Sequence, residues 1–374
     1  MTTLEDVAKH AGVSLATASR VLNGSSRHVG ADLRRRVESA AARLGYRVDA
    51  TAQTLARGAS NVVGLVIQDL IDPYFAVIAD GAIRAADRHG MVTTLGTTYR
   101  DPEREIALVA TLHAQRARVV LLAGSRVADE AVLRRQRAEL DVYRSAGGRV
   151  AVIGQDVLGT DTVAPRNREG AYDLAVALAG LGHRRFAVLA GPPVLLTAID
   201  RTQGFVEALA DLGLPPPLLV HGDFDRDGGR DAACRLIAMD HDVTCVFAVN
   251  DLMATGALAG LREHGVRVPR DLSLAGFDGT SSIRDPVPSL ATVRLPLARM
   301  GAMALDLALS GEGVPRHERV TGEVVLRDSV RPLARTPSVP SAPPVPPASS
   351  VPSAPAAVPA NRSAASPGAR PPHS

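Results

Sequence analysis

Residues 3–23 join two short amphipathic segments through a glycine, a spacing that few small folds satisfy. Ala8 is small where two crossing helices would approach most closely, and Gly12 can adopt the positive φ that a tight turn between helices often needs. Four further apolar residues fill the space that the helices share; they are Val7, Val13, Ala18 and Val21. The pattern predicts a helix-turn-helix that binds duplex DNA, with an ordinary helical hairpin as the alternative.

The second of these helices exposes small or polar residues, as a helix that enters the major groove requires. Arg20 is the best candidate for contacting a base, because a guanidinium can donate to guanine O6 and N7 together. Thr17, Ser19 and Asn23 suit phosphate contacts, which set the register on the duplex. The predicted DNA-contacting residues of this region are Thr3, Leu4, Ser14, Leu15, Ala16, Thr17, Ser19, Arg20, Asn23 and His28.

Basic residues are concentrated at the start of the chain. A third predicted helix, residues 31–44, turns four arginines outward and ends at Gly45. Its predicted inward residues are Leu33, Val37, Ala40, Ala41 and Leu44, and its arginines are Arg34, Arg35, Arg36 and Arg43. Residues 1–60 hold nine basic and five acidic side chains, whereas the net charge of the whole chain is only +3. The basic surface is therefore local, as phosphate binding requires.

The spacing of residues 3–23 resembles that of the DNA-binding head of the lac-repressor and galactose-repressor family of bacterial regulators. That head runs Thr-Leu/Ile-x-Asp-Val-Ala-x-x-Ala-Gly-Val-Ser-x-x-Thr-Val-Ser-Arg-Val-Leu-Asn, and this chain follows it from Thr3 to Asn23. It departs at Ala18, where the family usually has valine. We expect that change to reduce packing without altering the fold.

Residues 49–57 are similar to the hinge helix of the same family, one face of which enters the minor groove and wedges a leucine into the central base step. Ala52 and Leu55 are three residues apart and so share one face, which makes Leu55 the predicted wedge. Val48 and Asp49 stand where the family has proline and asparagine, and a carboxylate caps a helix well but repels phosphate. A plain linker helix is the alternative.

From residue 62 to residue 275 the chain alternates buried strands with helices. The predicted strands are 62–67, 91–95, 119–123, 150–153, 186–190, 218–220, 245–249 and 272–275. Buried strands separated by helices predict a parallel sheet covered on both faces. These strands are about twice as many as one compact sheet needs, so we expect two sheets with a cleft between them. Ligands in such folds bind beyond the carboxyl ends of the strands.

Four motifs in this body also resemble the family, in the family's order. They are Leu181-Gly182-His183-Arg184, Arg201-x-x-Gly204-Phe205, Asn250-Asp251 with Ala254 and Gly256, and Gly276-Phe277-Asp278. The resemblance covers residues 62 to about 332 and implies a two-lobed body with the architecture of periplasmic solute-binding proteins. It also implies that the arginine, the Asn-Asp pair and the last aspartate line an effector cleft.

The side chains at these positions suit a sugar. Arg201 can donate a fork of hydrogen bonds, Asp278 can accept and Asn250 can do both, which together satisfy neighbouring hydroxyls. Tyr74 and Phe75, on the predicted first strand-to-helix loop at 72–75, and Phe224 could stack on an apolar ring face. For each of these residues, packing in the core or a loop is the alternative. The chain departs from the family at Ala117-Arg118 and Gly154-Gln155-Asp156, so a nucleobase remains the second candidate effector.

Motifs for metal binding and catalysis are incomplete or missing, so the sequence predicts no enzyme, no cofactor and no metal site. Asp223, Asp225 and Asp227 copy the first half of a calcium loop, but Cys234 stands where a bidentate glutamate is needed. Gly-rich phosphate loops and the Gly-x-Ser-x-Gly elbow are missing. Cys234 and Cys245 lack metal spacing and are expected to be buried thiols. No signal segment or spanning apolar run is present, which favours a cytoplasmic protein without membrane contact.

These patterns divide the chain into a helix-turn-helix DNA-binding domain (1–47, the head), a hinge helix (48–60), a two-lobed effector-binding and dimerisation domain (61–335, the body) and a Pro/Ala/Ser-rich tail (336–374). The tail has too few large apolar groups to fold and is expected to be disordered. Its prolines exclude the leucine-repeat helix by which some relatives form tetramers, so we expect a homodimer on a pseudo-palindromic operator.

The predicted function is a transcriptional regulator, a repressor in preference to an activator, whose operator affinity is controlled by a small molecule. A solute-binding protein would need an export signal and would have no DNA-binding head. An enzyme with a fused regulatory head would need a catalytic constellation, which the sequence does not supply.

Overall fold

The fold was analysed in a computed structural model, which describes residues 2–22, 29–46, 60–311 and 313–333. Predictions for Asn23, His28, Ala52 and Leu55 lie outside these residues, as do residues 48–59 of the predicted hinge helix and the predicted tail. Within the described residues no helix is long and apolar enough to cross a membrane.

The head contains three helices, α1 (Leu4–Ala11), α2 (Leu15–Leu22) and α3 (Ala31–Arg43). Thr3 caps α1 through a reciprocal pair of bonds with Asp6, a capping box that satisfies two backbone N–H groups. Gly12 adopts φ +62° between α1 and α2, and a Cβ there would lie 2.7 Å from the Arg36 guanidinium. The helix-turn-helix is therefore confirmed. The buried residues that hold it together are Val7, Ala8, Ala11, Ala18, Val21, Val37, Ala40 and Ala41.

Two details of α3 differ from the prediction. Leu33 is 37% exposed, because none of the described elements of the head covers the first turn of α3. Arg36 is not simply directed outward: its Nη2 donates to the Ala11 carbonyl oxygen at 2.6 Å. The last carbonyls of a helix lack partners within the helix, and a nearby guanidinium can satisfy them.

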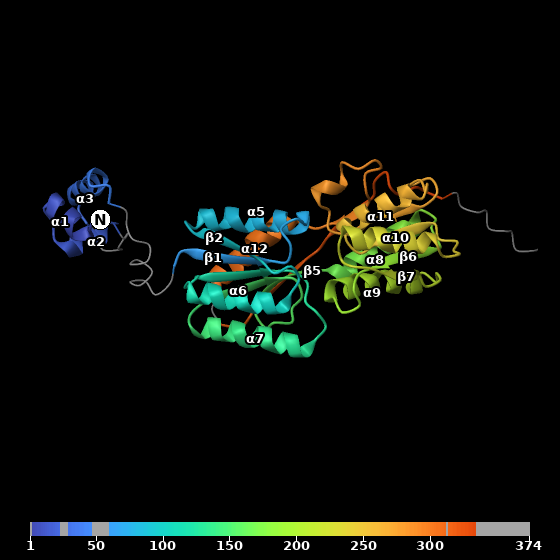
Figure 1. The fold of residues 1–374 in the computed structure, drawn as a ribbon, viewed down its shortest axis with the longest axis horizontal. Helices are drawn as coiled ribbons and strands as arrows, with labels where there is room; N and C mark the ends of the chain where they lie inside the picture. The colour runs from blue at the N-terminus through green and yellow to red at the C-terminus, as the bar shows by residue number, and fades with distance from the viewer. Residues whose placement is uncertain (1, 23–28, 47–59, 312, 334–374) are drawn as a thin grey trace, which may run out of the picture. The chain divides into compact units, whose positions relative to one another are not determined.

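The body has two lobes, each built on a parallel sheet (Figure 1). The sheet of the N-terminal lobe has strand order β11-β5-β4-β3-β1-β2, and that of the C-terminal lobe has order β7-β6-β8-β9. The strands of the first sheet are β1 (Val62–Ile67), β2 (Val92–Thr97), β3 (Val119–Ala123), β4 (Arg149–Ile153), β5 (Asp161–Pro165) and β11 (His317–Val320). The strands of the second are β6 (Phe186–Ala190), β7 (Leu218–His221), β8 (Cys245–Ala248) and β9 (Ser273–Ala275). The predicted pair of parallel sheets is confirmed.

Helices cover both faces of each sheet (Figure 1). In the N-terminal lobe α5 (Pro73–Arg88) packs beside α12 (Leu297–Ser310) on one face, with α6 (Pro102–Ala114) and α7 (Glu130–Ser145) on the other. In the C-terminal lobe α8 (Asn167–Gly180) pairs with α9 (Leu196–Asp211), and α10 (Arg226–Ile237) with α11 (Asp251–Glu263). The buried faces of these helices and strands form the apolar core of each lobe.

The chain passes between the lobes at three places. These crossing segments lie between β5 and α8, between β10 (Thr292–Arg294) and α12, and between β11 and β12 (Glu323–Val325). β10 and β12 pair with each other, and the Arg166 N–H donates to the Val320 carbonyl oxygen at 2.9 Å. The crossing segments are therefore bonded to one another. Because of them, α12 and β11 belong to the N-terminal lobe although they come late in the sequence.

The first helix of the body begins earlier than predicted, at Pro73 instead of residue 76. The Asp72 carboxylate accepts a bond from the Tyr74 N–H at 2.9 Å, and Pro73 occupies the first helical position, where its missing N–H has no cost. Tyr74 and Phe75 therefore lie in the first turn of α5 and not on a loop.

The contact between α5 and α12 depends on glycine. A Cβ on Gly81 would lie 1.9 Å from the Ala298 carbonyl oxygen, and a Cβ on Gly301 would lie 2.1 Å from that of Ile78. We expect Gly81→Ala to lower the free energy of unfolding by about 1–3 kcal/mol or more, because the two helices must move apart. Urea denaturation measures this. The control is Gly180→Ala, since a Cβ at Gly180 meets no atom within 4 Å, and equal stability of the two variants would contradict the prediction.

Candidate functional site

The start of α2 is an exposed part of the described head. Ser14, Leu15 and Ala16 are exposed, and Leu15 has half of its surface in solvent. Ser14 Oγ accepts from the Thr17 N–H at 3.1 Å and lies 2.9 Å from Thr17 Oγ1. Ser14 thus caps α2, and its bonds to Thr17 fix the position of two predicted DNA-contacting hydroxyls.

The other predicted head residues differ in exposure. Thr3 is exposed beside the start of α1, whereas Leu4 and Ser19 are half-buried. Arg20 is exposed and forms no ion pair with a described residue. By contrast, Lys9, Arg34 and Arg35 each lie within 4 Å of a carboxylate on their own helix. Arg20 therefore carries the positive charge of α2 without a neutralising partner among the described residues.

In the body, all six predicted effector residues line one cleft between the lobes. They are Tyr74, Phe75, Arg201, Phe224, Asn250 and Asp278. The free space left between these side chains is about 30 Å³, room for a water or two, so the cleft is nearly closed in this structure. It lies beyond the carboxyl ends of β1, β6 and β8, where the topology of parallel sheets leads one to expect a ligand.

Arg201 is the centre of the cleft's hydrogen bonds, although its side chain is only 2% exposed. Its Nε donates to Asn167 Oδ1 at 2.9 Å, its Nη1 to the Val249 carbonyl oxygen at 2.8 Å, and its Nη2 to Asp278 Oδ1 at 2.8 Å. The guanidinium also lies 3.9 Å from the centre of the Phe277 ring. A guanidinium has five N–H groups, so two remain for a further partner.

The acids around Arg201 bind protons more tightly than usual. Burial raises the pKa of Asp278 to about 6 against the opposing effect of Arg201, and the charge of Asp72 adds to the rise. Burial and the charge of Asp278 raise the pKa of Asp251 to about 8, although Thr280 and Thr292 donate to its carboxylate. At neutral pH Asp251 therefore mostly holds a proton, and Asp278 is close to taking one up.

Asp278 also has an unusual backbone conformation, with φ +117°. Non-glycine residues rarely adopt positive φ, and the conformation costs on the order of 1–3 kcal/mol unless neighbouring structure enforces it. Here the Asp278 N–H donates to the Val293 carbonyl oxygen at 2.9 Å, and its own carbonyl oxygen accepts from the Leu295 N–H at 3.0 Å. The carboxylate is thus held beside the crossing segment that joins β10 to α12.

Asn250 and the three aromatic residues have partly structural roles. Asn250 Oδ1 caps α11 by accepting from the Met253 N–H at 2.6 Å, and its NH₂ group donates to the Phe224 carbonyl oxygen at 3.5 Å, which leaves one N–H for a ligand. Phe75 is 4% exposed and belongs to the core, with the edge of Tyr74 against it at 5.0 Å between ring centres. Phe224 is half-buried, and Arg100 lies over its ring at 5.6 Å.

Several cleft residues were not predicted from the sequence. Gln68 and Arg100 come from the N-terminal lobe, and Asn167 and Thr197 from the C-terminal lobe. Arg100 Nη1 donates to the Phe224 carbonyl oxygen at 2.7 Å and so joins the lobes across the cleft. Gln68 directly follows β1, and the rule that ligands bind beyond strand ends would have selected it.

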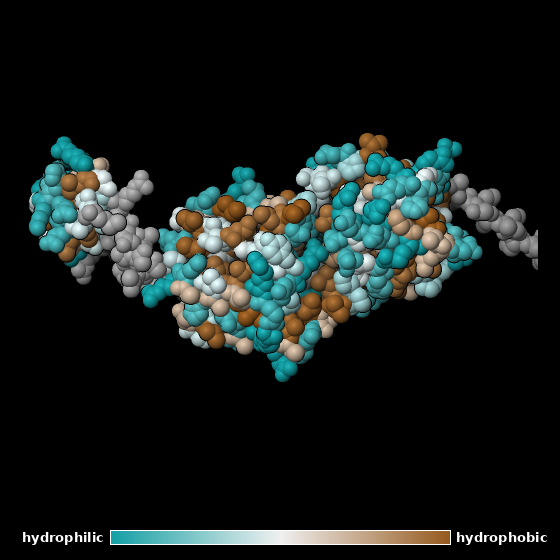
Figure 2. Space-filling view, in the orientation of Figure 1, coloured by the Kyte–Doolittle hydropathy of each residue, from teal (hydrophilic) through white to brown (hydrophobic). Residues whose placement is uncertain are grey.

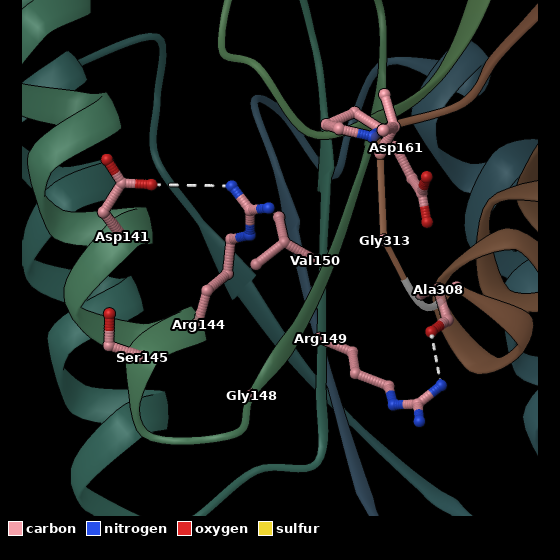
Figure 3. Close-up of a pocket in the computed structure, with 12 residues that line it drawn as sticks. Asp141, Arg144, Ser145, Gly148, Arg149, Val150, Asp161, Ala308 and Gly313 are labelled. Carbon is pink, nitrogen blue, oxygen red and sulfur yellow. Dashed lines mark hydrogen bonds and ion pairs between the residues drawn. The ribbon is translucent and has the colours of Figure 1, made fainter.

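Other candidate sites are already engaged in internal bonds. Asp225, from the partial calcium loop, caps α10 by accepting from the Gly228 N–H at 2.8 Å. Of the two cysteines, Cys245 is buried as predicted, but Cys234 is only half-buried. Figure 3 shows a second hollow, at the carboxyl end of α7, where Arg144 pairs with Asp141 at 3.5 Å and Arg149 Nη1 donates to the Ala308 carbonyl oxygen at 3.3 Å. We assign no function to that hollow.

Comparison with known proteins agrees with this architecture. Residues 3–49 match the family described as "Bacterial regulatory proteins, lacI family", and residues 175–330 match the "Periplasmic binding protein-like domain". The HTH-type transcriptional regulator GalS of Salmonella typhimurium strain LT2 is 34% identical over 315 residues, which cover 83% of this chain and 90% of the relative. The chain belongs to the lacI family. It is accordingly a DNA-binding transcriptional regulator.

Solved structures of the family share the same fold. The lac repressor dimer bound to operator and the anti-inducer ONPF matches with a TM-score of 0.77 at 26% identity, covering 88% of this chain and 99% of that one. The complex of the transcriptional regulator CelR with cellobiose matches with a TM-score of 0.64 at 29% identity, covering 88% of this chain and 100% of that one.

The shifted pKa values predict how stability depends on pH. The pKa values of Asp251 and Asp278 are raised above that of an unfolded aspartate, so their contribution to stability is complete below about pH 4 and lost as pH rises through 6 and then 8. We expect the free energy of unfolding to fall more steeply between pH 5 and 9 in the wild type than in Asp251→Asn. Urea unfolding at several pH values measures both curves. The buried His183 is present in both proteins, so its contribution to the pH dependence cancels when the two curves are compared. Wild-type and Asp251→Asn curves that run parallel would contradict the prediction.

Proposed function

We propose that this protein represses transcription by binding a pseudo-palindromic operator through its head, and that a sugar in the cleft controls that binding. The observation that carries the proposal is the meeting of six predicted effector residues around one cleft between the lobes. The polar groups there include both donors and acceptors, as hydroxyls require: Arg201 donates, Asp278 accepts, and Asn250 has one N–H left to donate. Phe224 and Tyr74 offer apolar surface to a ring face.

Two relatives support a sugar and a repressor. One was solved with cellobiose bound and the other is the lac repressor on its operator. A nucleobase is the second candidate, since the aromatic rings could stack on it as well. Repression and activation differ in where the operator lies relative to the promoter, and the likeness to a repressor favours the former.

The mechanism we infer couples the cleft to the head through the crossing segments. Asn167 begins the helix that follows one crossing segment, Asp278 is bonded to another, and Arg201 joins these two residues directly. A ligand that changes these bonds would change the angle between the lobes and hence the separation of the residues that lead to the head. The coupling is reciprocal, because operator binding must shift ligand affinity by the same factor.

We further propose that the protein works as a homodimer joined in part through the α5 and β2 side of the N-terminal lobe. β2 is an edge strand whose Val92 and Leu95 are exposed, and Ile83 of α5 is also exposed. Figure 2 shows apolar surface over this part of the lobe. Burial of such a surface against a second copy would place two heads on two half-sites.

The effector proposal is tested by fluorescence anisotropy of the full chain on DNA from upstream of its own gene, at stated salt, with a panel of sugars and nucleobases. We expect one sugar to release the DNA. In Arg201→Met the concentration of that sugar needed for release should rise on the order of 100-fold, because two charge-assisted hydrogen bonds are lost. The control is Arg168→Met, which removes an exposed arginine paired with Glu207. Release by a nucleobase alone, or an unchanged response in Arg201→Met, would contradict the proposal.

The base contact proposed for Arg20 is tested on the same DNA. We expect Arg20→Ala to weaken operator binding by about 1–3 kcal/mol, roughly 5- to 150-fold, because a bidentate contact to guanine is lost. Binding to unrelated DNA should change much less. Arg43→Ala is the control, since Arg43 is also exposed but lies at the end of α3. An equal loss on operator and unrelated DNA would make Arg20 a phosphate contact instead.

A further inference from the structure

A groove opens between the carboxyl ends of α6 and α7, at the end of the N-terminal lobe where the strands of its sheet begin. It holds about 760 Å³. Its walls come from the last turns of the two helices and from the residues that precede β3 and β4. Most of the lining residues are alanine or glycine, and the charged ones are Arg116 and Arg118. The groove therefore lets a partner approach the backbone closely between two arginines.

The positive charge of the groove is not neutralised by the described part of the chain. Arg116 and Arg118 are exposed, neither guanidinium bonds to a described residue, and no described acidic residue lines the groove. In the adjoining hollow of Figure 3, by contrast, Arg144 pairs with Asp141. The body as a whole is acidic, since residues 61–330 hold 29 basic and 34 acidic side chains. The two arginines are therefore a local exception and not part of a generally basic surface.

Arg116 occupies a backbone position that suits glycine. It follows α6 with φ +56°, and its N–H donates to the His113 carbonyl oxygen at 2.8 Å. A left-handed conformation is unfavourable for residues with a Cβ, and glycine is the usual residue just after a helix. The backbone gains nothing from an arginine here, so the reason for this residue lies in its side chain.

The chain from the DNA-binding head enters the body at this same residue. The Ser60 N–H and the Ser60 Oγ both donate to the Arg116 carbonyl oxygen, at 3.1 and 2.7 Å. Only residues 47–59 separate Ser60 from Tyr46, the last described residue of the head. Even fully extended, a segment of this length spans at most about 50 Å. The groove therefore stays within that distance of the head and of any DNA that the head binds.

A DNA backbone is the partner that fits this groove. Duplex DNA carries one negative charge per about 1.7 Å of helix axis, and the head brings it to this end of the body. A guanidinium can bond two oxygens of one phosphate and remains charged at any physiological pH. An acidic protein would also be attracted by the arginines, but nothing in the chain brings such a protein to this place.

We propose that Arg116 and Arg118 contact phosphates of the DNA that the head binds, so that the body provides a second DNA-contacting surface. Phosphate contacts carry no sequence information directly. They add affinity and hold the N-terminal lobe at a fixed distance from the duplex. This surface needs only the DNA-binding function of the chain, whatever effector the cleft takes.

Fluorescence anisotropy of the full chain on DNA from upstream of its own gene tests this between about 50 and 200 mM salt. The logarithm of the binding constant falls linearly with the logarithm of the salt concentration, and each phosphate contact adds about 0.9 to the steepness. We expect the double variant Arg116→Gln/Arg118→Gln to bind more weakly, with a slope shallower by about 1.8 for each subunit. A slope equal to that of the wild type would overturn the contact even if the affinity fell, because no phosphate charge would then have been released.

Two matched variants separate this contact from other effects of charge. Arg262→Gln/Arg270→Gln removes two exposed arginines from the C-terminal lobe and should leave the slope unchanged. An equal decrease of the slope in that variant would show that the net charge of the body determines it, and would overturn the proposal. Arg116→Lys/Arg118→Lys keeps both charges and should retain most of the slope. A slope as shallow as that of the glutamine variant would contradict neutralisation of phosphates by these two side chains.

Discussion

The buried guanidinium of Arg201 organises the body, because it bonds to three segments that are far apart in the sequence. It contacts Asn167 at the start of α8, the backbone at the end of β8, and Asp278 after β9. A charge this deeply buried is tolerated only when its hydrogen bonds are largely satisfied, so these segments must stay in register with one another. The same bonds define the floor of the cleft. A ligand that competes for them therefore acts on the framework of the lobe and not only on its surface.

The backbone conformation of Asp278 also links the cleft to the crossing segment between β10 and α12. Asp278 has a strained positive φ that β10 and the following residues enforce. Its neighbour Asp251 is a buried carboxyl group whose pKa is raised although Thr280 and Thr292 donate to it. Both features oppose stability and are tolerated because the surrounding bonds hold them in place. Backbone strain and shifted pKa values are common at sites that respond to a ligand. In this protein both occur at Asp278, beside the crossing segment between β10 and α12.

The sequence predicted those parts of the fold that depend on local pattern or on residue type. The spacing of Ala8 and Gly12 determined the helix-turn-helix, and the continuous apolar runs located most strands of both sheets. Arg201, Asn250 and Asp278 were found because the family motifs mark them and their chemistry suits a cleft. Phe75 shows the limit of residue type: an aromatic at the mouth of a cleft can be committed to the core, as its 4% exposure shows. The hinge segment and tail lie outside the described residues, so their predictions stay predictions.

Contacts between residues far apart in the chain could not be predicted from one sequence. Nothing near Glu105 indicates that Arg126 and Gln136 will lie against it, since they follow it by 21 and 31 residues. Strands β5 and β11 were missed because they are short and partly polar; β5 is held between β4 and β11, and β11 pairs with β5 at the edge of the sheet. The start of α5 was misplaced because an aspartate and a proline were taken as loop formers, whereas together they cap and begin a helix.

The three crossing segments have a consequence for synthesis of the protein. The N-terminal lobe takes α12 and β11 from residues 297–320, after the whole C-terminal lobe up to β10 has been made. A ribosome that has translated only the first half of the chain therefore exposes a sheet with an uncovered edge and an α5 whose partner helix does not yet exist. Folding during translation cannot finish one lobe before starting the other, and both lobes are completed almost together at the end of elongation. The apolar face of α5 in the nascent chain consequently stays uncovered for longer than it would in a lobe made of consecutive residues.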